Sequence, residues 1–132
     1  MTLLDTNVIV HYLKGDPGIV ARIRHASRDE IAIPSIVVYE LEYGTLRSRL
    51  PAQRRRTLRE GLADIRHMPF DTAAALAAAG IRLELERRGM TIGPLDLLVA
   101  GTAASLGAVL VTNNAAELSR VPGLRVEDWR MA

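Results

Sequence analysis

The chain of 132 residues contains no cysteine, which excludes disulfide bonds and thiolate metal sites and fits a reducing compartment. It also contains no Gly-x-Gly sequence, so a dinucleotide-binding fingerprint and a Walker loop are absent, as is a Ser-His-Asp signature. The start, MTLLDTN, has no long apolar run. We therefore expect neither a secretory signal nor a membrane span, and a cytoplasmic protein.

Lysine is almost missing as well, since sixteen of the seventeen basic residues are arginine. Arginine favours bidentate contacts with phosphate, which suits nucleic acid. The net charge is only +2, however, and charge alone favours an ordinary solvated surface. Six arginines surround Pro51 and are either a binding patch for RNA or an acidic partner, or the exposed side of two helices: Arg47, Arg49, Arg54, Arg55, Arg56 and Arg59. The three histidines have no metal-like spacing and are interpreted as ordinary residues.

Short apolar segments alternate with helical patterns along the whole chain. The expected strands are residues 3–4, 31–33, 108–111 and 126–129, with residues 67–70 a short strand or an extended link. This alternation predicts a single α/β domain over residues 1–132, with a short, mostly parallel central sheet flanked by helices. Helix N-caps are expected at Thr6 or Asn7, at Ser35 and at Asp71.

The stretch PLDLLVAGTAASLGAVLVTNN, residues 94–114, predicts a helix that ends near Gly107 and a buried strand that ends in three polar residues. Asp96 lies in the first turn of this helix. In open α/β folds, ligands bind outside the carboxyl ends of the strands. The segment is therefore expected to bring Asp96 and the Thr-Asn-Asn group to one site.

Four acidic residues stand where surface charges are not expected: Asp5, Glu40, Asp96 and Glu117. Taken singly, each is explained as a helix cap or a half-exposed acid, and a carboxylate at a helix N-terminus is stabilised by roughly 0.3–1 kcal/mol. Taken together, converging carboxylates repel one another, by about 4 kcal/mol for a pair 4 Å apart at an effective dielectric of 20. Such a group needs protons or a cation, and oxygen ligands favour Mg²⁺ or Mn²⁺ over zinc.

Three blocks in order resemble the PIN-domain ribonucleases, more narrowly the VapC-type toxins of type II toxin–antitoxin pairs. They are LLDTNVIVHYL at 3–13, PSIVVYELEYG at 34–44 and the segment from Gly93 to Trp129. The resemblance covers nearly the whole chain. It implies that Asp5, Glu40 and Asp96 are catalytic metal ligands, Glu40 directly or through water. Glu42 is the lower-ranked alternative to Glu40, because it lies about 200° further round the helix.

The fourth acid departs from the usual pattern of the resembled family. Many members carry Asp where this chain has Asn114, a weaker and neutral ligand. Members with the Thr-Asn-Asn pattern have an acid three residues later, so the resemblance implies that Glu117 completes the catalytic and metal-binding set. Asn7 and Thr112 are expected to support these ligands or their waters.

The resemblance also implies an activity and partners. We expect Mg²⁺-dependent hydrolysis of an RNA phosphodiester, with Mn²⁺ as a possible substitute and transfer RNA as the substrate, leaving a 5′-phosphate and a 3′-hydroxyl. The partners implied are a VapB-type antitoxin and a second copy of the chain in a homodimer. One face of the Ala-rich helix at 73–88 is expected in the core, and its small residues would also allow close packing in such a dimer. Two alternatives stay open: a PIN-like domain that binds RNA or protein without cutting, and a nuclease directed at DNA.

Overall fold

A five-stranded sheet organises the protein. The computed structural model describes residues 1–131, and residue 132, the last of the expected domain, lies outside them. The strands are β1 (Thr2–Leu4), β2 (Ile31–Pro34), β3 (Arg66–Met68), β4 (Val109–Val111) and β5 (Arg125–Glu127). They pair in the order β3-β2-β1-β4-β5, and every pairing is parallel. The expected α/β class is confirmed.

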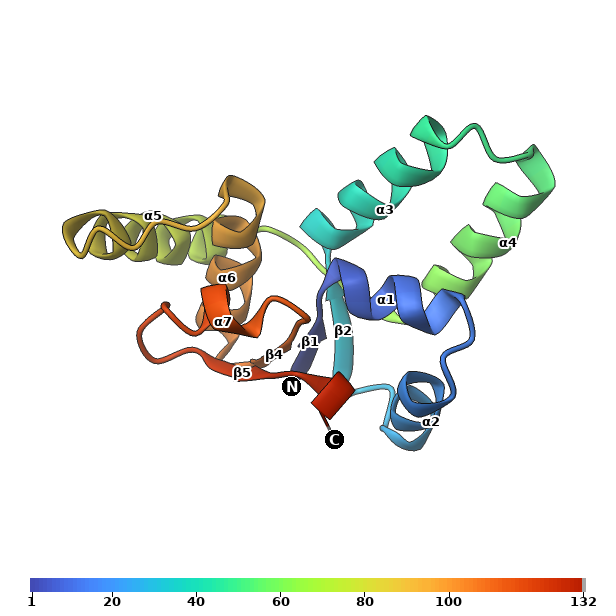
Figure 1. Cartoon of the computed structure of the whole chain (residues 1–132), viewed down its shortest axis with the longest axis horizontal. Helices are drawn as coiled ribbons and strands as arrows, with labels where there is room; N and C mark the ends of the chain where they lie inside the picture. The colour runs from blue at the N-terminus through green and yellow to red at the C-terminus, as the bar shows by residue number, and fades with distance from the viewer. Residues whose placement is uncertain (132) are drawn as a thin grey trace.

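Helices connect the strands and flank the sheet (Figure 1). They are α1 (Thr6–Leu13), α2 (Pro17–His25), α3 (Ser35–Arg47), α4 (Ala52–Ala63), α5 (Thr72–Arg87), α6 (Pro94–Leu106), α7 (Ala115–Leu118) and the 3-10 turn η1 (Trp129–Met131). Figure 1 shows α3 and α4 reaching away from the sheet as two arms, with α5 and α6 on the other side. Across residues 1–131, none of these helices is long and apolar enough to cross a membrane.

The strand order reverses at the centre of the sheet. From β1 the chain adds β2 and then β3 on one side, and it returns to place β4 and then β5 on the other. The last residues of the neighbouring strands are in register, Leu4 beside Val111, and the backbone N–H of Asp5 donates to the carbonyl of Val111 at 2.9 Å. The chain thus makes a topological switch point between β1 and β4, where open parallel sheets bind their ligands.

Two of the expected helix caps are wrong. Asp5, not Thr6 or Asn7, caps α1, because Asp5 has extended backbone angles and its Oδ1 accepts from the backbone N–H of Thr6 at 2.8 Å. Pro34 occupies the cap position of α3 without a side-chain bond, so Ser35 is already its first helical residue. The cap at Asp71 is confirmed by its bond from the Ala74 N–H at 2.9 Å.

Small residues bring α5 and α6 into close contact. A Cβ added at Gly101 of α6 would lie 2.6 Å from the Ala78 Cβ and 2.8 Å from the Ala74 carbonyl oxygen, distances that real side chains do not reach. The expectation that one face of the Ala-rich helix belongs to the core is confirmed, since Ala74 and Ala78 on this face of α5 are buried. The tight contact fixes α6, and with it Asp96, against the body of the protein.

Candidate active site

An open cleft lies at the switch point between β1 and β4. It has a volume of about 580 Å³ and is lined by residues from six segments: Asp5, Thr6, Asn7, His11, Glu40, Asp96, Asn113, Asn114 and Arg130. Three of the four acids singled out in the sequence, Asp5, Glu40 and Asp96, thus meet in one cleft. They come from the end of β1, the first half of α3 and the first turn of α6.

Asp5 has a structural role and a place in the cleft at once. Only 7% of its surface is exposed. Its Oδ1 accepts from the Thr6 backbone N–H, and its Oδ2 accepts from the Thr112 hydroxyl at 2.7 Å. Thr112, itself 1% exposed, directly follows β4. The two central strands therefore hold this carboxylate between them, which fixes its position for any ligand in the cleft.

Glu40 is held by a residue that the sequence reasoning did not assign to the site. The Thr6 hydroxyl donates to the Glu40 Oε1 at 3.0 Å. Burial raises the pKa of Glu40, the bond from Thr6 opposes that rise, and the Asp5 charge adds to it. A signal for Thr6 exists only in retrospect: it follows Asp5 directly and so begins the helix that faces the cleft.

Glu42, the lower-ranked alternative to Glu40, is engaged elsewhere. It forms an ion pair with Arg59 of α4, and the hydrogen bond from Arg59 holds the pKa of Glu42 below its usual value. It is not among the residues that line the cleft. The two acids lie two helical positions apart and face different directions, as the helical rotation requires.

Asp96 is the acid whose charge the surroundings disfavour most clearly. Burial, followed by the charges of Asp5 and Glu117, raises the pKa of Asp96 to about 6. The N-terminus of α6 and a bond from Asn114 act in the opposite direction. Because the rise prevails, a helix-stabilising role does not explain this residue. Buried carboxylates that disfavour one another's charge are typical of a cation site.

Asn114 links Asp96 to the fourth acid. Its Nδ2 donates to the Asp96 Oδ2 at 3.3 Å and to the Glu117 Oε2 at 2.8 Å, and its backbone N–H donates to the Thr112 hydroxyl at 3.0 Å. The Glu117 Oε1 accepts from the Gly93 N–H at 3.1 Å. These bonds lower the pKa of Glu117, Asn114 first. Glu117 thus adjoins the cluster with both oxygens engaged, and its role as a ligand stays a prediction.

The cleft is also lined by Asn113, which belongs to the expected Thr-Asn-Asn group, and by two residues that the sequence did not assign to the site, His11 and Arg130. His11 lies four positions after Asn7 on α1, so the two share one helical face. That spacing was a usable signal, although the histidine was interpreted as ordinary. Arg130 comes from the C-terminal turn, whose path over the cleft no local pattern reveals.

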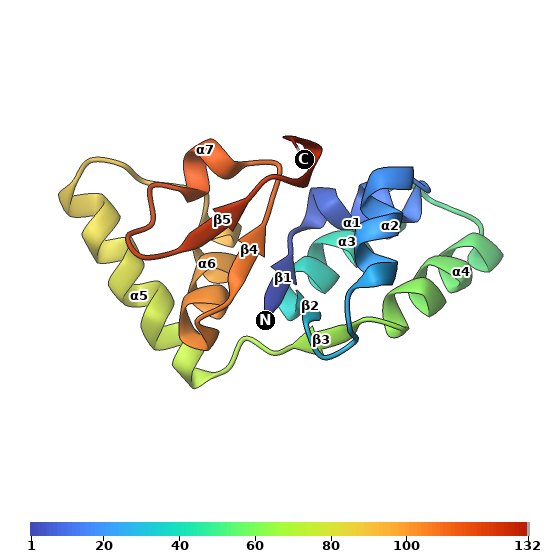
Figure 2. The same ribbon diagram turned by 90° about the horizontal axis from the view of Figure 1, so that it is seen from below.

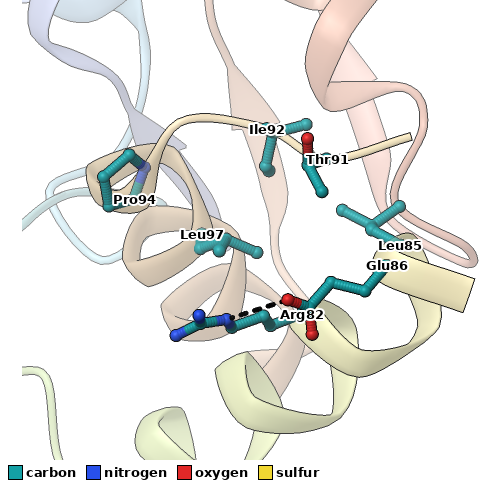
Figure 3. Close-up of a pocket in the computed structure, with 7 residues that line it drawn as sticks. All are labelled: Arg82, Leu85, Glu86, Thr91, Ile92, Pro94 and Leu97. Carbon is teal, nitrogen blue, oxygen red and sulfur yellow. Dashed lines mark ion pairs between the residues drawn. The ribbon is translucent and has the colours of Figure 1, made fainter. Parts of the chain in front are cut away.

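A second hollow lies between α5 and the start of α6 (Figure 3). Its volume is about 240 Å³, and its lining is mainly apolar: Leu85, Ile92, Pro94 and Leu97, with Thr91 and the Arg82–Glu86 pair. The one carboxylate there already pairs with Arg82 at 3.6 Å. This hollow therefore lacks the uncompensated negative charge that distinguishes the cleft at the switch point.

The donors of the cleft fit a hard divalent cation, because carboxylate and amide oxygens are what Mg²⁺ and Mn²⁺ prefer. Within residues 1–131, no three His, Cys, Asp or Glu side chains yet lie close enough together to share one ion. Thr6 and Thr112 each bond one carboxylate, those of Glu40 and Asp5, and Asn114 bonds those of both Asp96 and Glu117. Mg²⁺ usually keeps several waters and is held by only one or two carboxylates, so this spacing is compatible with a hydrated ion.

Comparison with known proteins defines the class of this fold and site. Residues 2–124 match the PIN domain, and the chain belongs to the PIN-domain family. Within that family it belongs to the VapC group. It is 37% identical over 127 residues to the tRNA(fMet)-specific endonuclease VapC of Shigella flexneri, covering 96% of both chains. It is 36% identical over 129 residues to the ribonuclease VapC2 of Rickettsia felis, again covering 96% of both.

The fold agrees with a solved structure of the same group. The crystal structure of DNA-bound VapBC from Salmonella typhimurium contains a chain that is 37% identical to this one, with a TM-score of 0.90 over 97% of both chains. The family named from three sequence blocks is thereby confirmed.

Proposed function

We propose that the chain is the toxin of a type II toxin–antitoxin module and acts as an Mg²⁺-dependent endoribonuclease. The observation that carries the proposal is the meeting of Asp5, Glu40 and Asp96 at the switch point, where burial and the neighbouring acids raise the pKa of Asp96 to about 6. The VapC relatives are named ribonucleases and endonucleases, which supports the same activity here.

The catalytic and metal-binding set of this proposal is Asp5, Glu40, Asp96 and Glu117, with Asn7, Thr112 and Asn114 in support. Bound there, Mg²⁺, or Mn²⁺ in its place, would supply an acidified water nucleophile and would stabilise charge on the leaving oxygen. Thr112 and Thr6 orient the carboxylates of Asp5 and Glu40. Asn114 holds Asp96 and Glu117 in one arrangement. No side chain acts as nucleophile, and the products are a 5′-phosphate and a 3′-hydroxyl.

Transfer RNA is the proposed substrate. Two relatives, from Shigella flexneri and Salmonella typhimurium, are named tRNA(fMet)-specific endonucleases and are 37% and 36% identical to this chain. The open form of the cleft suits a polymer, because a chain can pass across it rather than being enclosed. Which transfer RNA is cut depends on contacts that the fold family does not determine.

The proposed partners are a VapB-type antitoxin and a second copy of the chain, with both acting in the cytoplasm. Solved VapBC complexes share the fold, and two of them are bound to DNA. A homodimer is supported by apolar side chains on the outer face of α5 and just beyond it: Leu76, Leu83 and Met90 are 71%, 49% and 49% exposed. An apolar patch of this kind is typical of an interaction surface.

One observation favours a second candidate function, a PIN-like domain that binds RNA or protein without cutting it. The neutral Asn114 stands where an acid is common in the resembled family, and its amide occupies oxygens of both Asp96 and Glu117. If these bonds persist in the presence of Mg²⁺, the cleft holds a cation too weakly for catalysis.

The deciding experiment incubates antitoxin-free protein with total transfer RNA, with and without Mg²⁺, beside Asp96→Asn. We expect discrete fragments with 5′-phosphate ends that require both the metal and Asp96, and that return when Mn²⁺ replaces Mg²⁺. RNA binding that survives EDTA, with no fragments from folded protein in either metal, would support the binding domain instead. Competing RNA and DNA oligonucleotides in the same assay test the DNA-directed alternative.

A further inference from the structure

One arginine lines a cleft otherwise dominated by acids. Arg130 belongs to the same cleft as Asp5, Glu40 and Asp96. It belongs to the C-terminal turn η1, which Figure 2 shows beyond the end of β5. A polyanion that approaches three carboxylates is repelled, so a fixed cation at this position has a direct bearing on how RNA enters.

The guanidinium of Arg130 is held in one orientation. Its Nε and Nη2 donate to the two carboxylate oxygens of Asp128 at 3.1 and 2.7 Å, and Nη2 also donates to the carbonyl of Asn113 at 2.9 Å. The neighbouring Trp129 anchors the turn, since its indole donates to Glu127 at 3.1 Å and lies under the guanidinium of Arg22. Arg130 is therefore fixed to the loop that follows β4.

These bonds leave one edge of the guanidinium for a ligand. Arginine has five N–H donors, and the bonds to Asp128 and Asn113 use the hydrogens of Nε and Nη2. Within residues 1–131 the ion pair of Arg130 is with Asp128 and not with a carboxylate of the cleft. The arginine is thus oriented by Asp128, which does not line the cleft, and across the described part of the chain it forms no ion pair with the acids that do.

We propose that Arg130, clamped by Asp128 and the Asn113 carbonyl, forms a phosphate subsite that binds a backbone phosphate of RNA beside the one that is cut. The Nη1 edge donates to that phosphate, while the α1 face with Asn7 and His11 forms another wall of the same cleft. Backbone contacts of this kind set the register of the polymer without reading its sequence. The inference rests on the proposed function for the identity of the ligand.

The test compares Arg130→Gln, Arg130→Lys and a matched control, Arg88→Gln. Arg88 is exposed to a similar degree, 50% against 53%, and also forms an ion pair, but it follows α5 and does not line the cleft. The probe is a fluorescein-labelled single-stranded RNA of twelve nucleotides and mixed sequence. Its affinity is measured by anisotropy with Ca²⁺ in place of Mg²⁺, between 50 and 300 mM salt, with gels to check that the probe stays intact.

We expect Arg130→Gln to weaken binding about five- to twenty-fold at low salt and to reduce the slope of log affinity against log salt by about 0.7, the value for one phosphate of a single strand. Arg130→Lys restores the slope, because lysine keeps the charge. It restores only part of the affinity, because lysine lacks the planar fork of donors. In cleavage of total transfer RNA with Mg²⁺, Arg130→Gln raises KM more than it lowers kcat.

An unchanged salt slope in Arg130→Gln, or an equal loss in Arg88→Gln, overturns the subsite. Thermal unfolding of each variant shows whether the turn is merely loosened. If Arg130 had a purely structural role, its loss would lower Tm, and Arg130→Lys would not restore the salt slope of RNA binding. Failure of the proposed function is distinguishable: wild-type protein that binds the probe through Arg130 but cuts no transfer RNA refutes the nuclease and supports the phosphate subsite.

Discussion

The cleft at the switch point and the α5–α6 contact use the same helix, α6, in opposite ways. At its start, α6 presents Asp96 to a cleft where burial and neighbouring acids oppose its charge. In its middle, Gly101 lets α6 approach Ala74 and Ala78 without a gap. Neighbouring acids therefore repel the charge at the start of α6, and the tight packing of its middle keeps the helix in place.

This difference separates residues that serve stability from residues that serve chemistry. Packing contacts are mutually favourable in the native state, whereas functional sites keep groups together that would be more stable apart. Substitutions in the α5–α6 contact should therefore lower stability without changing catalysis in the folded protein. Substitution of Asp96 should abolish catalysis while stability stays equal or rises, whereas substitution of Asp5 should also remove the cap of α1 and the bond from Thr112.

The largest expected effect separates two acids on one helix. Glu40→Gln removes a carboxylate of the cleft, and we expect RNA cleavage to fall on the order of 100-fold or more, as for the loss of a preorganised electrostatic group. Glu42→Gln breaks only the exposed pair with Arg59 and should leave cleavage and Tm unchanged. Cleavage rates of purified variants on total transfer RNA decide the matter, and equal losses in both variants would remove Glu40 from the site.

Next in size is the loss of the hydroxyl that fixes Asp5. Thr112→Val keeps the shape of the side chain but leaves a buried carboxylate oxygen without its donor, so the free energy of unfolding should fall by about 2 kcal/mol. Cleavage should fall as well, because Asp5 is no longer oriented. Urea unfolding and cleavage rates measure the two effects.

Thr102→Val is the matched control for this variant. Thr102 is equally buried, at 1% exposure, but its hydroxyl donates to the Leu98 carbonyl within α6. That carbonyl already belongs to a helix, so the cost should be below about 1 kcal/mol and cleavage should not change. A Thr102 variant that loses as much activity as the Thr112 variant would show that the effect is one of general packing.

Substitutions of two glycines test the role of the α5–α6 contact in stability. Gly101→Ala forces a Cβ against the Ala74 backbone, and we expect a loss of about 1–2 kcal/mol of unfolding free energy after the gain in helix propensity. Gly80→Ala in α5 meets nothing within 4 Å and should stabilise by about 0.5–1 kcal/mol. Urea unfolding measures both variants, and the prediction fails unless their unfolding free energies change in opposite directions. The folded Gly101→Ala protein should retain the wild-type kcat.

Much of the site could be predicted because strand ends obey a general rule. Asp5 follows β1 and Thr112 follows β4, and the carboxyl ends of adjacent parallel strands meet at one edge. Glu40 and Asp96 were found because an acid within an apolar helical pattern needs a reason. The caps of α1 and α3 were predicted wrongly, because cap preference alone does not say where extended backbone gives way to helix.

The contacts that no pattern predicted depend on the path of the chain. Arg130 reaches the cleft through the turn η1 that follows β5, and Thr6 meets Glu40 across 34 residues of sequence. The expected last strand, residues 126–129, ends instead at Glu127, and Trp129 begins the turn that anchors Arg130. Long-range side-chain pairs of this kind follow from tertiary packing rather than from local propensity.

The smallest expected effect is a gain in stability, and it bears most directly on the comparison. The pKa of Asp96 is raised from 3.8 to about 6 on folding. The native state therefore binds a proton more tightly than the unfolded chain does, so the stabilising contribution is complete below pH 4 and is lost as the pH rises through about 6. At pH 8, without metal, Asp96→Asn should be more stable than wild type by about 1 kcal/mol, after allowance for the partial exposure of Asp96.

Below pH 4 the two proteins should unfold alike, because Asp96 is protonated and resembles the neutral amide. Adding Mg²⁺ at pH 8 should reverse their order, since a cation bound only by the native state stabilises wild type by mass action and finds one ligand fewer in the variant. Urea unfolding at pH 4, 6 and 8, with EDTA or with 10 mM Mg²⁺, measures all three conditions. If Asp96→Asn is less stable than wild type at pH 8 in EDTA, the helix dipole outweighs the repulsion, and Asp96 serves the fold in the same way as the α5–α6 contact.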